Sequence, residues 1–308
     1  MSVKGSSGNL VISIDDFIAS NTRDDKKRDE GLTTPSDIER FDDIRYGENE
    51  RNVLDVYRPK DCEGKLPVIV SVHGGGWVYG NKSINQFYCM SLAQKGFAVV
   101  NFSYRLSPEY KHPTPLIDTN KVFKWVIENA DAYEFDTDNV FAVGDSVGAN
   151  IVGFFCCLCL DNEYAKKLSV KPPKDFVPKA LGLNCGLYCL ERGKEPLLDN
   201  LAAEYFPKGG TDEEYGEIDL KKHIKSTFPP SFIATASEDF LRSQAKPFYE
   251  FLKSLGVETE YRCYGDEKNV LTHVFHINIK LDGARECNAD ECEFFKKHIE
   301  RHKGKDLK

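Results

Sequence analysis

Apolar residues follow two patterns along this chain, and each pattern predicts one kind of element. Continuous apolar runs, such as Leu66–His73 and Phe97–Tyr104, are typical of strands that are buried on both faces of a sheet. Segments with helically spaced apolar residues, such as Pro115–Ala130, predict amphipathic helices. The other predicted strands are Asn52–Pro59, Asn139–Asp145, Pro178–Gly186, Pro229–Ser237 and Glu258–Gly265, and the other predicted helices are Gln86–Gly96, Val147–Leu160, Ser243–Gly256 and Glu291–His302.

The order of these elements predicts the fold class. From about residue 41 to residue 308, predicted strands alternate with predicted helices. Because helical crossovers connect parallel strands, the alternation predicts an α/β domain with a mostly parallel central sheet flanked by helices. The alternation is interrupted at about 187–228, where the sequence is polar and aromatic and fits no strand. We predict that this insertion is helical and forms a small cap over the carboxyl edge of the sheet.

The N-terminal arm, residues 1–40, is polar and irregular, and we predict that it forms part of the same cap. Within it, Leu10–Ser20 is compatible with one short amphipathic helix, and Ser36 has the character of a second helix start. The charged run Asp24–Glu30 interleaves acids with bases, so we interpret it as a solvated face.

Composition and charge restrict the partners that the chain can have. The 308 residues include 41 basic and 49 acidic ones, a net charge of −8, which argues against binding to nucleic acid. The sequence has no signal-peptide pattern and no apolar run of about 20 residues, the length that a membrane span needs. Its ten cysteines lack zinc-finger spacing. We predict a reduced, cytoplasmic protein without a membrane partner. A trimmed secreted chain is an open alternative for the location, and a homodimer is a separate open possibility.

A candidate nucleophile follows one of the predicted buried strands. Ser146 stands between Gly144 and Gly148 in a Gly-x-Ser-x-Gly pattern, with a predicted strand before it and a predicted helix after it. This context is the one that a nucleophile elbow requires. A serine also needs a base, an acid that orients the base, and donors for an oxyanion. The glycines of "HGGGW", His73–Trp77, and the backbone N–H of Val147 are the candidate donors.

Candidates for the acid and the base follow the serine in the chain, at the ends of later predicted strands. Asp239 and its neighbour Glu238 are the candidate acids, and His273 and His276 are the candidate bases. The carboxyl ends of the strands are where open α/β sheets build their sites. The residues alone leave both choices open.

These blocks together resemble the α/β-hydrolase carboxylesterases of the hormone-sensitive-lipase-like branch. The resemblance rests on "HGGGW", "FSYRLSPEYKHPTPLID", "GDSVGAN", "SEDFLRS" and "THVFH", and it covers roughly residue 44 to the C-terminus except the insertion. It implies an α/β-hydrolase fold and a serine esterase that needs no metal or organic cofactor. It further implies a catalytic triad of Ser146, Asp239 and His273, and an oxyanion hole formed by Gly75, Gly76 and Val147.

The chain departs from the family motif at three positions. Val147 replaces the usual Ala, Val274 replaces Gly after the histidine, and Phe240 replaces Pro after the acid. We expect Phe275 to anchor the histidine loop, and we expect the side chain of His276 to form a local hydrogen bond. No departure removes a catalytic group.

The function predicted from these residues is hydrolysis of a small-molecule ester with a short acyl chain. Val147 and the aromatic residues Tyr205, Phe206 and Tyr215 of the predicted cap are expected to close a small pocket. Three alternatives remain: an amidase or peptidase on the same fold, a non-catalytic ligand-binding homologue, and a lipase that acts at oil–water interfaces. The retained His273 disfavours the second, and the lack of a strongly apolar surface helix disfavours the third.

Overall fold

The computed structural model describes residues 13–300, so residues 1–12 of the predicted N-terminal arm and residues 301–302 of the predicted last helix lie outside the described part. An eight-stranded sheet crosses the molecule in the order β1-β2-β4-β3-β5-β6-β7-β8. The pairs β1–β2 and β2–β4 are antiparallel, and the other neighbours are parallel. The strands are β1 (Ile38–Arg45), β2 (Val53–Pro59), β3 (Leu66–Val72), β4 (Ala98–Phe102), β5 (Phe135–Asp145), β6 (Leu181–Asn184), β7 (Ser231–Ala236) and β8 (Thr259–Tyr264). The predicted α/β class and mostly parallel sheet are confirmed.

Two layers of helices bury the two faces of this sheet. Alternation of side chains along β3 sends Val70 to one face and Ile69 to the other. Val70 belongs to the core cluster that includes residues of α3, α4 and α8, whereas Ile69 belongs to the cluster that includes residues of α2 and α9. The main helices are α1 (Ile14–Asp29), α2 (Gln86–Ala93), α3 (Thr114–Glu128), α4 (Val147–Leu160), α8 (Arg242–Ser254) and α9 (Asp282–Lys297).

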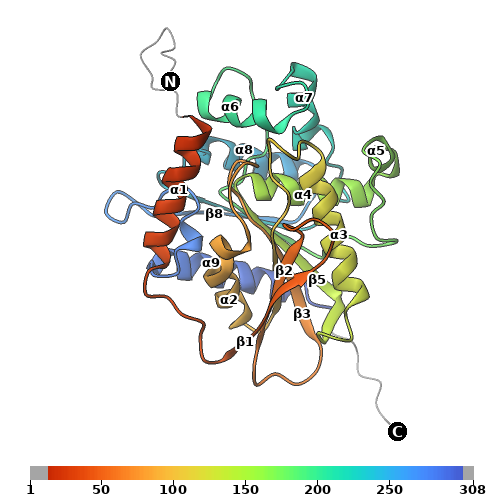
Figure 1. Ribbon diagram of the computed structural model, residues 1–308, viewed down its shortest axis with the longest axis vertical. Helices are drawn as coiled ribbons and strands as arrows, with labels where there is room; N and C mark the ends of the chain where they lie inside the picture. Colours follow the sequence, from red (N-terminus) through yellow and green to blue (C-terminus); the bar gives the residue numbers. More distant parts are fainter. Residues whose placement is uncertain (1–12, 301–308) are drawn as a thin grey trace.

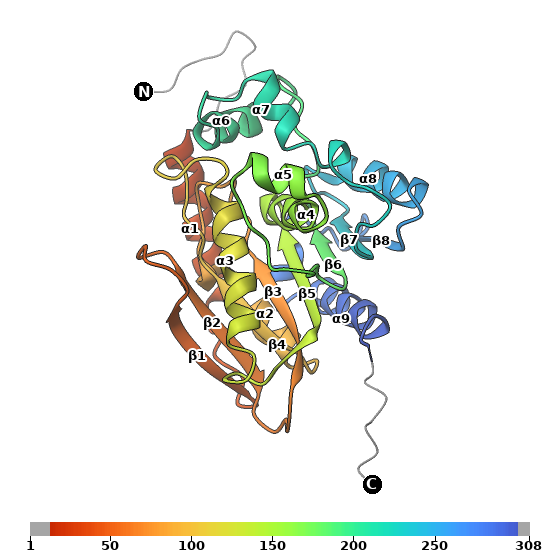
Figure 2. The same cartoon turned by 90° about the vertical axis from the view of Figure 1, so that its right-hand side faces the viewer.

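The predicted insertion is helical, and its helices lie near the carboxyl ends of the parallel strands (Figures 1 and 2). The segment 187–228 contains α6 (Pro196–Tyr205), α7 (Asp212–Glu217) and a short 3₁₀ helix, Leu220–Lys222. Figures 1 and 2 show α6 and α7 together at the top of the molecule, with the upper end of α1 beside α6. The upper end of α1 therefore lies at the same end of the molecule as the insertion, whereas β1 does not (Figures 1 and 2).

The N-terminal region corrects two predictions from the sequence. Ser36 does not start a helix, because the next residues form β1, an edge strand that pairs with β2. The predicted short helix exists but extends to Asp29, so it includes most of the charged run. Asp24, Lys26 and Lys27 are exposed, as our interpretation of a solvated face requires, whereas Asp25 and Arg28 are only partly exposed. We find no helix among residues 13–300 with the length and apolarity needed to cross a membrane.

Candidate active site

Ser146 occupies a sharp turn between β5 and α4, at the centre of the sheet. Its backbone has φ 53° and ψ −120°, a conformation that an L-residue rarely adopts. The flanking glycines make the turn possible. A Cβ on Gly144 would lie 2.5 Å from the carbonyl of Gly148, and a Cβ on Gly148 would collide with the carbonyl oxygen of Val72 in β3. Only glycine at these two positions allows β3, β5 and the start of α4 to approach this closely, and the close packing holds Ser146 at the apex of the turn.

The structure brings His273 and Asp239 together. Nδ1 of His273 lies 2.7 Å from Oδ1 of Asp239, and His273 lines the same cavity as Ser146. Asp239 also accepts hydrogen bonds from the hydroxyl of Thr235 at 2.8 Å and from the backbone N–H of Leu241 at 3.0 Å. Burial by itself would raise the pKa of Asp239, but the bond to His273 and these two donors outweigh it and lower that pKa. The acid is thus ionised and fixed in position.

The rival acid and base lie elsewhere. Glu238 is exposed, and its backbone forms an isolated bridge to Thr272. His276 is fully buried, its ring packs edge-on against Tyr88 at 5.0 Å, and burial lowers its pKa to about 3. Neither ring nitrogen of His276 has a hydrogen-bond partner, so the predicted local hydrogen bond is wrong. His276 is a neutral residue of the core.

The loop that carries His273 is anchored as expected, and its backbone is strained at Val274. Phe275 is 4% exposed and contacts Tyr264, which confirms its predicted role as an anchor. Val274 adopts a positive φ of 52°, which costs a β-branched residue energy and explains why the family motif has Gly there. The ring of Phe240, which replaces Pro, lies 4.3 Å from the ring of His273 between centroids. Two of the three departures from the motif therefore contact or adjoin the imidazole.

Asp145, a residue that sequence reasoning missed, fixes the glycine loop beside Ser146. One carboxylate oxygen of Asp145 accepts a hydrogen bond from the N–H of Gly74 at 3.0 Å, and the other accepts one from Asn85 at 2.9 Å. Because the N–H of Gly74 is occupied, Gly75 and Gly76 are the loop residues whose N–H groups are left for the cavity, which they line together with Val147. A Cβ on Gly74 would collide with Asp145, so glycine is required at this position.

His73, the first residue of the same loop, has a structural place. Its ring stacks on Tyr104 with 4.1 Å between centroids, and its Nδ1 lies 2.8 Å from the carbonyl oxygen of Gly74. Complete burial lowers the pKa of His73 to about 3, so the ring is neutral and donates this bond. The hydroxyl of Tyr104 donates to the carbonyls of His73 and Gly74 at 3.0 Å each. These contacts satisfy the carbonyls of His73 and Gly74.

The cavity above Ser146 has a volume of about 160 Å³ and two chemically different sides. Leu197, Leu198 and Leu201, at the start of α6, line one side. Residues of α1 line another, among them Asn21, Asp25 and Arg28. The helical spacing of residues 21, 25 and 28 puts them on one face of α1, but no signal in the sequence shows that this face lines a cavity. Tyr205, Phe206 and Tyr215, which we expected to close the pocket, do not line it and instead pack within the core cluster that includes residues of α3, α4 and α8.

One group of side chains in the described residues has the composition of a metal site. Ligand atoms of Cys185, Asp239 and His273 lie within 4.8 Å of one another. A metal ion there would replace the 2.7 Å hydrogen bond between His273 and Asp239. We therefore assign these atoms to the acid–base pair.

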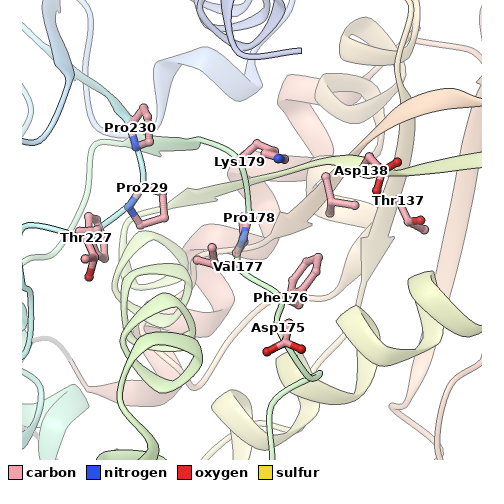
Figure 3. Close-up of a pocket in the computed structure, with 12 residues that line it drawn as sticks. Thr137, Asp138, Asp175, Phe176, Val177, Pro178, Lys179, Thr227, Pro229 and Pro230 are labelled. Carbon is pink, nitrogen blue, oxygen red and sulfur yellow. The ribbon is translucent and has the colours of Figure 1, made fainter. Parts of the chain in front are cut away.

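A second pocket, of about 350 Å³, opens at the amino ends of the strands, opposite to the end that carries Ser146 (Figure 3). It adjoins the amino ends of β6 and β7, where Pro178 and Pro230 precede the strands. Its lining includes Thr137, Lys179 and Thr227, and it contains neither Ser146 nor His273. Because the nucleophile and base candidates meet at the carboxyl edge, the smaller cavity is the candidate active site.

Two proteins of similar sequence are named esterases. Versiconal hemiacetal acetate esterase of Dothistroma septosporum is 27% identical over 249 residues, 72% of this chain and 71% of that protein. Carboxylesterase NlhH of Mycobacterium tuberculosis is 30% identical over 223 residues, 67% of this chain and 66% of that protein. The aligned region thus spans about two thirds of the length of these relatives.

Solved structures share the fold. Esterase B of Lactobacillus rhamnosis superposes with a TM-score of 0.84 at 21% identity, covering 92% of this chain and 93% of that chain. A family model described as "alpha/beta hydrolase fold" matches residues 69–277, which include Gly75, Gly76, Ser146, Asp239 and His273. The chain therefore belongs to the hormone-sensitive-lipase-like branch of the α/β hydrolases, a family of carboxylic ester hydrolases.

Proposed function

We propose that this chain is a serine carboxylesterase that hydrolyses short-chain acyl esters through Ser146, His273 and Asp239. The observation that carries the proposal is the 2.7 Å hydrogen bond between Asp239 and His273 at the cavity that Ser146 also lines. Among related proteins, one is named a carboxylesterase and another an acetate esterase, which supports the same reaction type.

The proposed reaction proceeds through an acyl-enzyme. The hydroxyl oxygen of Ser146 attacks the ester carbonyl while Nε2 of His273 takes the hydroxyl proton. Asp239 keeps the other proton on Nδ1 and stabilises the imidazolium that forms. The N–H groups of Gly75, Gly76 and Val147 donate to the oxyanion. His273 then protonates the leaving alcohol, and water repeats the sequence to release the acid and restore Ser146.

The size of the cavity supports a short acyl chain. A volume of about 160 Å³ is less than the roughly 300 Å³ at which pockets for drug-sized ligands begin. Val147 adds a branched side chain beside the nucleophile, and the leucines of α6 limit the opposite side. Acetyl to butyryl groups fit such a volume better than long chains.

The test is a series of p-nitrophenyl esters from acetate to decanoate, with p-nitrobutyranilide as the matched amide. We expect kcat/KM to be highest at or below butyrate and cleavage of the anilide to be far slower. A maximum at decanoate would contradict the short-chain proposal, and faster cleavage of the anilide would favour the amidase alternative. A phosphonate inhibitor followed by peptide mass mapping should label Ser146, whereas a label elsewhere would exclude it as the nucleophile.

A homodimer and a cytoplasmic location stay predictions. All ten cysteines are free thiols in the structure, and β1 and β8 are the edge strands of the sheet.

A further inference from the structure

The side of the cavity formed by α1 carries charged and polar groups that the proposed chemistry does not use. Asn21 and Asp25 are one helical turn apart on α1 and both line the cavity with Ser146. Residues with this spacing are neighbours on a helix surface. The triad, the oxyanion donors and the leucines of α6 account for the reaction and for the acyl group, but not for these two side chains.

Asp25 is held in a fixed orientation. Nη1 of Arg28 donates to one of its carboxylate oxygens at 2.7 Å, and the hydroxyl of Tyr79 donates to the other at 2.8 Å. Arg28 is itself fixed, since it also donates to Asp29 and to the carbonyl oxygen of Ile84. Burial raises the pKa of Asp25, so its carboxylate is poorly solvated. A rigid carboxylate that has lost water gains from any further donor that reaches it.

Most of the free valences of Asn21 and Asp25 are acceptors. Each carboxylate oxygen can accept about two hydrogen bonds, and each oxygen of Asp25 accepts one from the protein. Asn21 donates one N–H of its Nδ2 to the carbonyl of Phe17 at 2.8 Å, which leaves its Oδ1 as an acceptor and its second N–H as a donor. A ligand that satisfies both residues must therefore supply hydrogen-bond donors.

The charges at the cavity disfavour an anionic ligand. Arg28 donates to the carboxylates of Asp25 and Asp29. Burial by itself would lower the pKa of Arg28, but these two carboxylates and that of Asp145 outweigh it and raise that pKa. A free carboxylate group elsewhere on the ester substrate would meet a surplus of negative charge. Arg28 offsets the charge of Asp25 directly, so hydroxyl groups are sufficient as donors and a cation is not required.

We infer that Asn21 and Asp25 bind the hydroxyl groups of the alcohol part of the ester, so that the preferred substrates are short-chain monoesters of polyols. This inference rests on the proposed esterase function. The leucines of α6 face the acyl part, and the two acceptors of α1 receive hydroxyl hydrogens from neighbouring carbons of the alcohol. A simple alkyl alcohol would exclude water from Asp25 without adding a donor beyond those of Arg28 and Tyr79.

The test compares 1-glyceryl monobutyrate with propyl butyrate, which have the same acyl group and the same three-carbon alcohol. For the wild-type protein we expect kcat/KM for the glyceryl ester to be at least roughly tenfold higher, about 1.4 kcal/mol of preference. In Asp25→Ala, the ratio of the two kcat/KM values should fall roughly tenfold. Asp24→Ala, an exposed neighbour on the same helix, should keep the wild-type ratio.

The outcomes separate this inference from the proposed function. If the wild-type protein cleaves neither ester, the proposed function fails. If it cleaves both at equal kcat/KM, or prefers butyrylcholine to the glyceryl ester, only the inference is overturned. An equal loss on both esters in Asp25→Ala would show that Asp25 only holds α1 in place. If that variant does not fold, Asn21→Leu replaces it, and an unchanged ratio there would likewise overturn the inference.

Discussion

At the scale of single residues, the three proposed catalytic side chains differ in how firmly the fold holds them. The carboxylate of Asp239 is completely buried and accepts three hydrogen bonds. The side chain of His273 is 21% exposed and depends on Asp239 and on the ring of Phe240 for its orientation. Ser146 is fixed through its backbone, since its N–H donates to the carbonyl of Asn184 and its carbonyl accepts from Leu187. Asp239 thus orients a base that is partly open to solvent.

This arrangement predicts unequal losses of activity. Ser146→Ala and His273→Ala should each lower kcat by a factor on the order of 10⁶, because nucleophile and base act as a unit. Asp239→Asn should cost less, about 10⁴-fold, since the imidazole remains but in the wrong tautomer. The measurement is kcat and KM on p-nitrophenyl butyrate, with circular dichroism to confirm folding.

His276→Ala is the matched control for His273→Ala. Because His276 is buried in the core and makes no hydrogen bond through its ring, its truncation should lower the melting temperature. Its kcat/KM should stay within about tenfold of wild type, or 1.4 kcal/mol of barrier. An inactive His276→Ala beside an active His273→Ala would reverse the assignment of the base.

At the scale of elements, Asp145 connects the end of β5 to the glycine loop after β3. Asp145→Ala would leave the N–H of Gly74 and the amide of Asn85 without their acceptor. We expect kcat to fall roughly 10²-fold, the usual effect of a misplaced oxyanion donor, with a smaller change in KM.

Asp145→Asn is the informative partner of that variant. Its amide oxygen can accept from Gly74, and its NH₂ can donate to Oδ1 of Asn85 once the amide of Asn85 turns over, because Nδ2 of Asn85 faces residue 145 in the wild-type protein and its Oδ1 has no partner in the described structure. We therefore expect this variant to recover most of the lost kcat. Equal losses in both variants would mean that the charge of Asp145, rather than its hold on the loop, affects the reaction.

Strands buried on both faces could be predicted from the sequence, whereas the half-exposed edge strand β1 could not. The strands β3, β4, β6 and β7 each fall within a predicted strand, because parallel strands between two helical layers consist of apolar runs. The strand β5 begins at Phe135, before its predicted start at Asn139, and the edge strand β8 falls within its prediction although its residues are mostly not buried. The strand β1 contains five charged residues among its eight, so no strand pattern marks this edge of the sheet. For the site, the motifs predicted Ser146, Asp239 and His273, whereas the inward-facing residues of α1 follow only from tertiary packing.

At the scale of the whole molecule, a buried carboxyl group joins three elements beneath the candidate active site. Glu291 of α9 accepts a hydrogen bond from the hydroxyl of Tyr88 in α2 at 2.6 Å and one from the amide of Asn184 in β6 at 2.7 Å. The backbone carbonyl of Asn184 in turn accepts the N–H of Ser146 at 3.0 Å. A Cβ on Gly182 would collide with this carboxyl group, so β6 has glycine where α9 approaches it.

The burial of Glu291 makes stability depend on pH. Burial raises the pKa of Glu291 from 4.5 to about 7 in the folded protein, whereas in the unfolded chain the group regains its ordinary pKa. Between these two values the folded state binds more protons than the unfolded state, so this residue lowers the free energy of unfolding as pH rises from about 4.5 to 7. Its stabilising contribution is complete below that window and lost above it.

Glu291→Gln removes this ionisation and keeps the shape of the side chain. The amide oxygen of the new glutamine can accept from Tyr88, and its NH₂ can donate to Oδ1 of Asn184 once the amide of Asn184 turns over, because Nδ2 of Asn184 faces residue 291 in the wild-type protein and its Oδ1 has no partner in the described structure. Relative to wild type, we expect the variant's free energy of unfolding to gain on the order of 2 kcal/mol between pH 5 and pH 8. Urea unfolding at both pH values measures this change, with Glu286→Gln, an exposed position on the same helix, as the control. If the two variants followed the same pH dependence, Glu291 would titrate as an ordinary surface carboxyl, and another buried group would have to account for any fall in stability across this window.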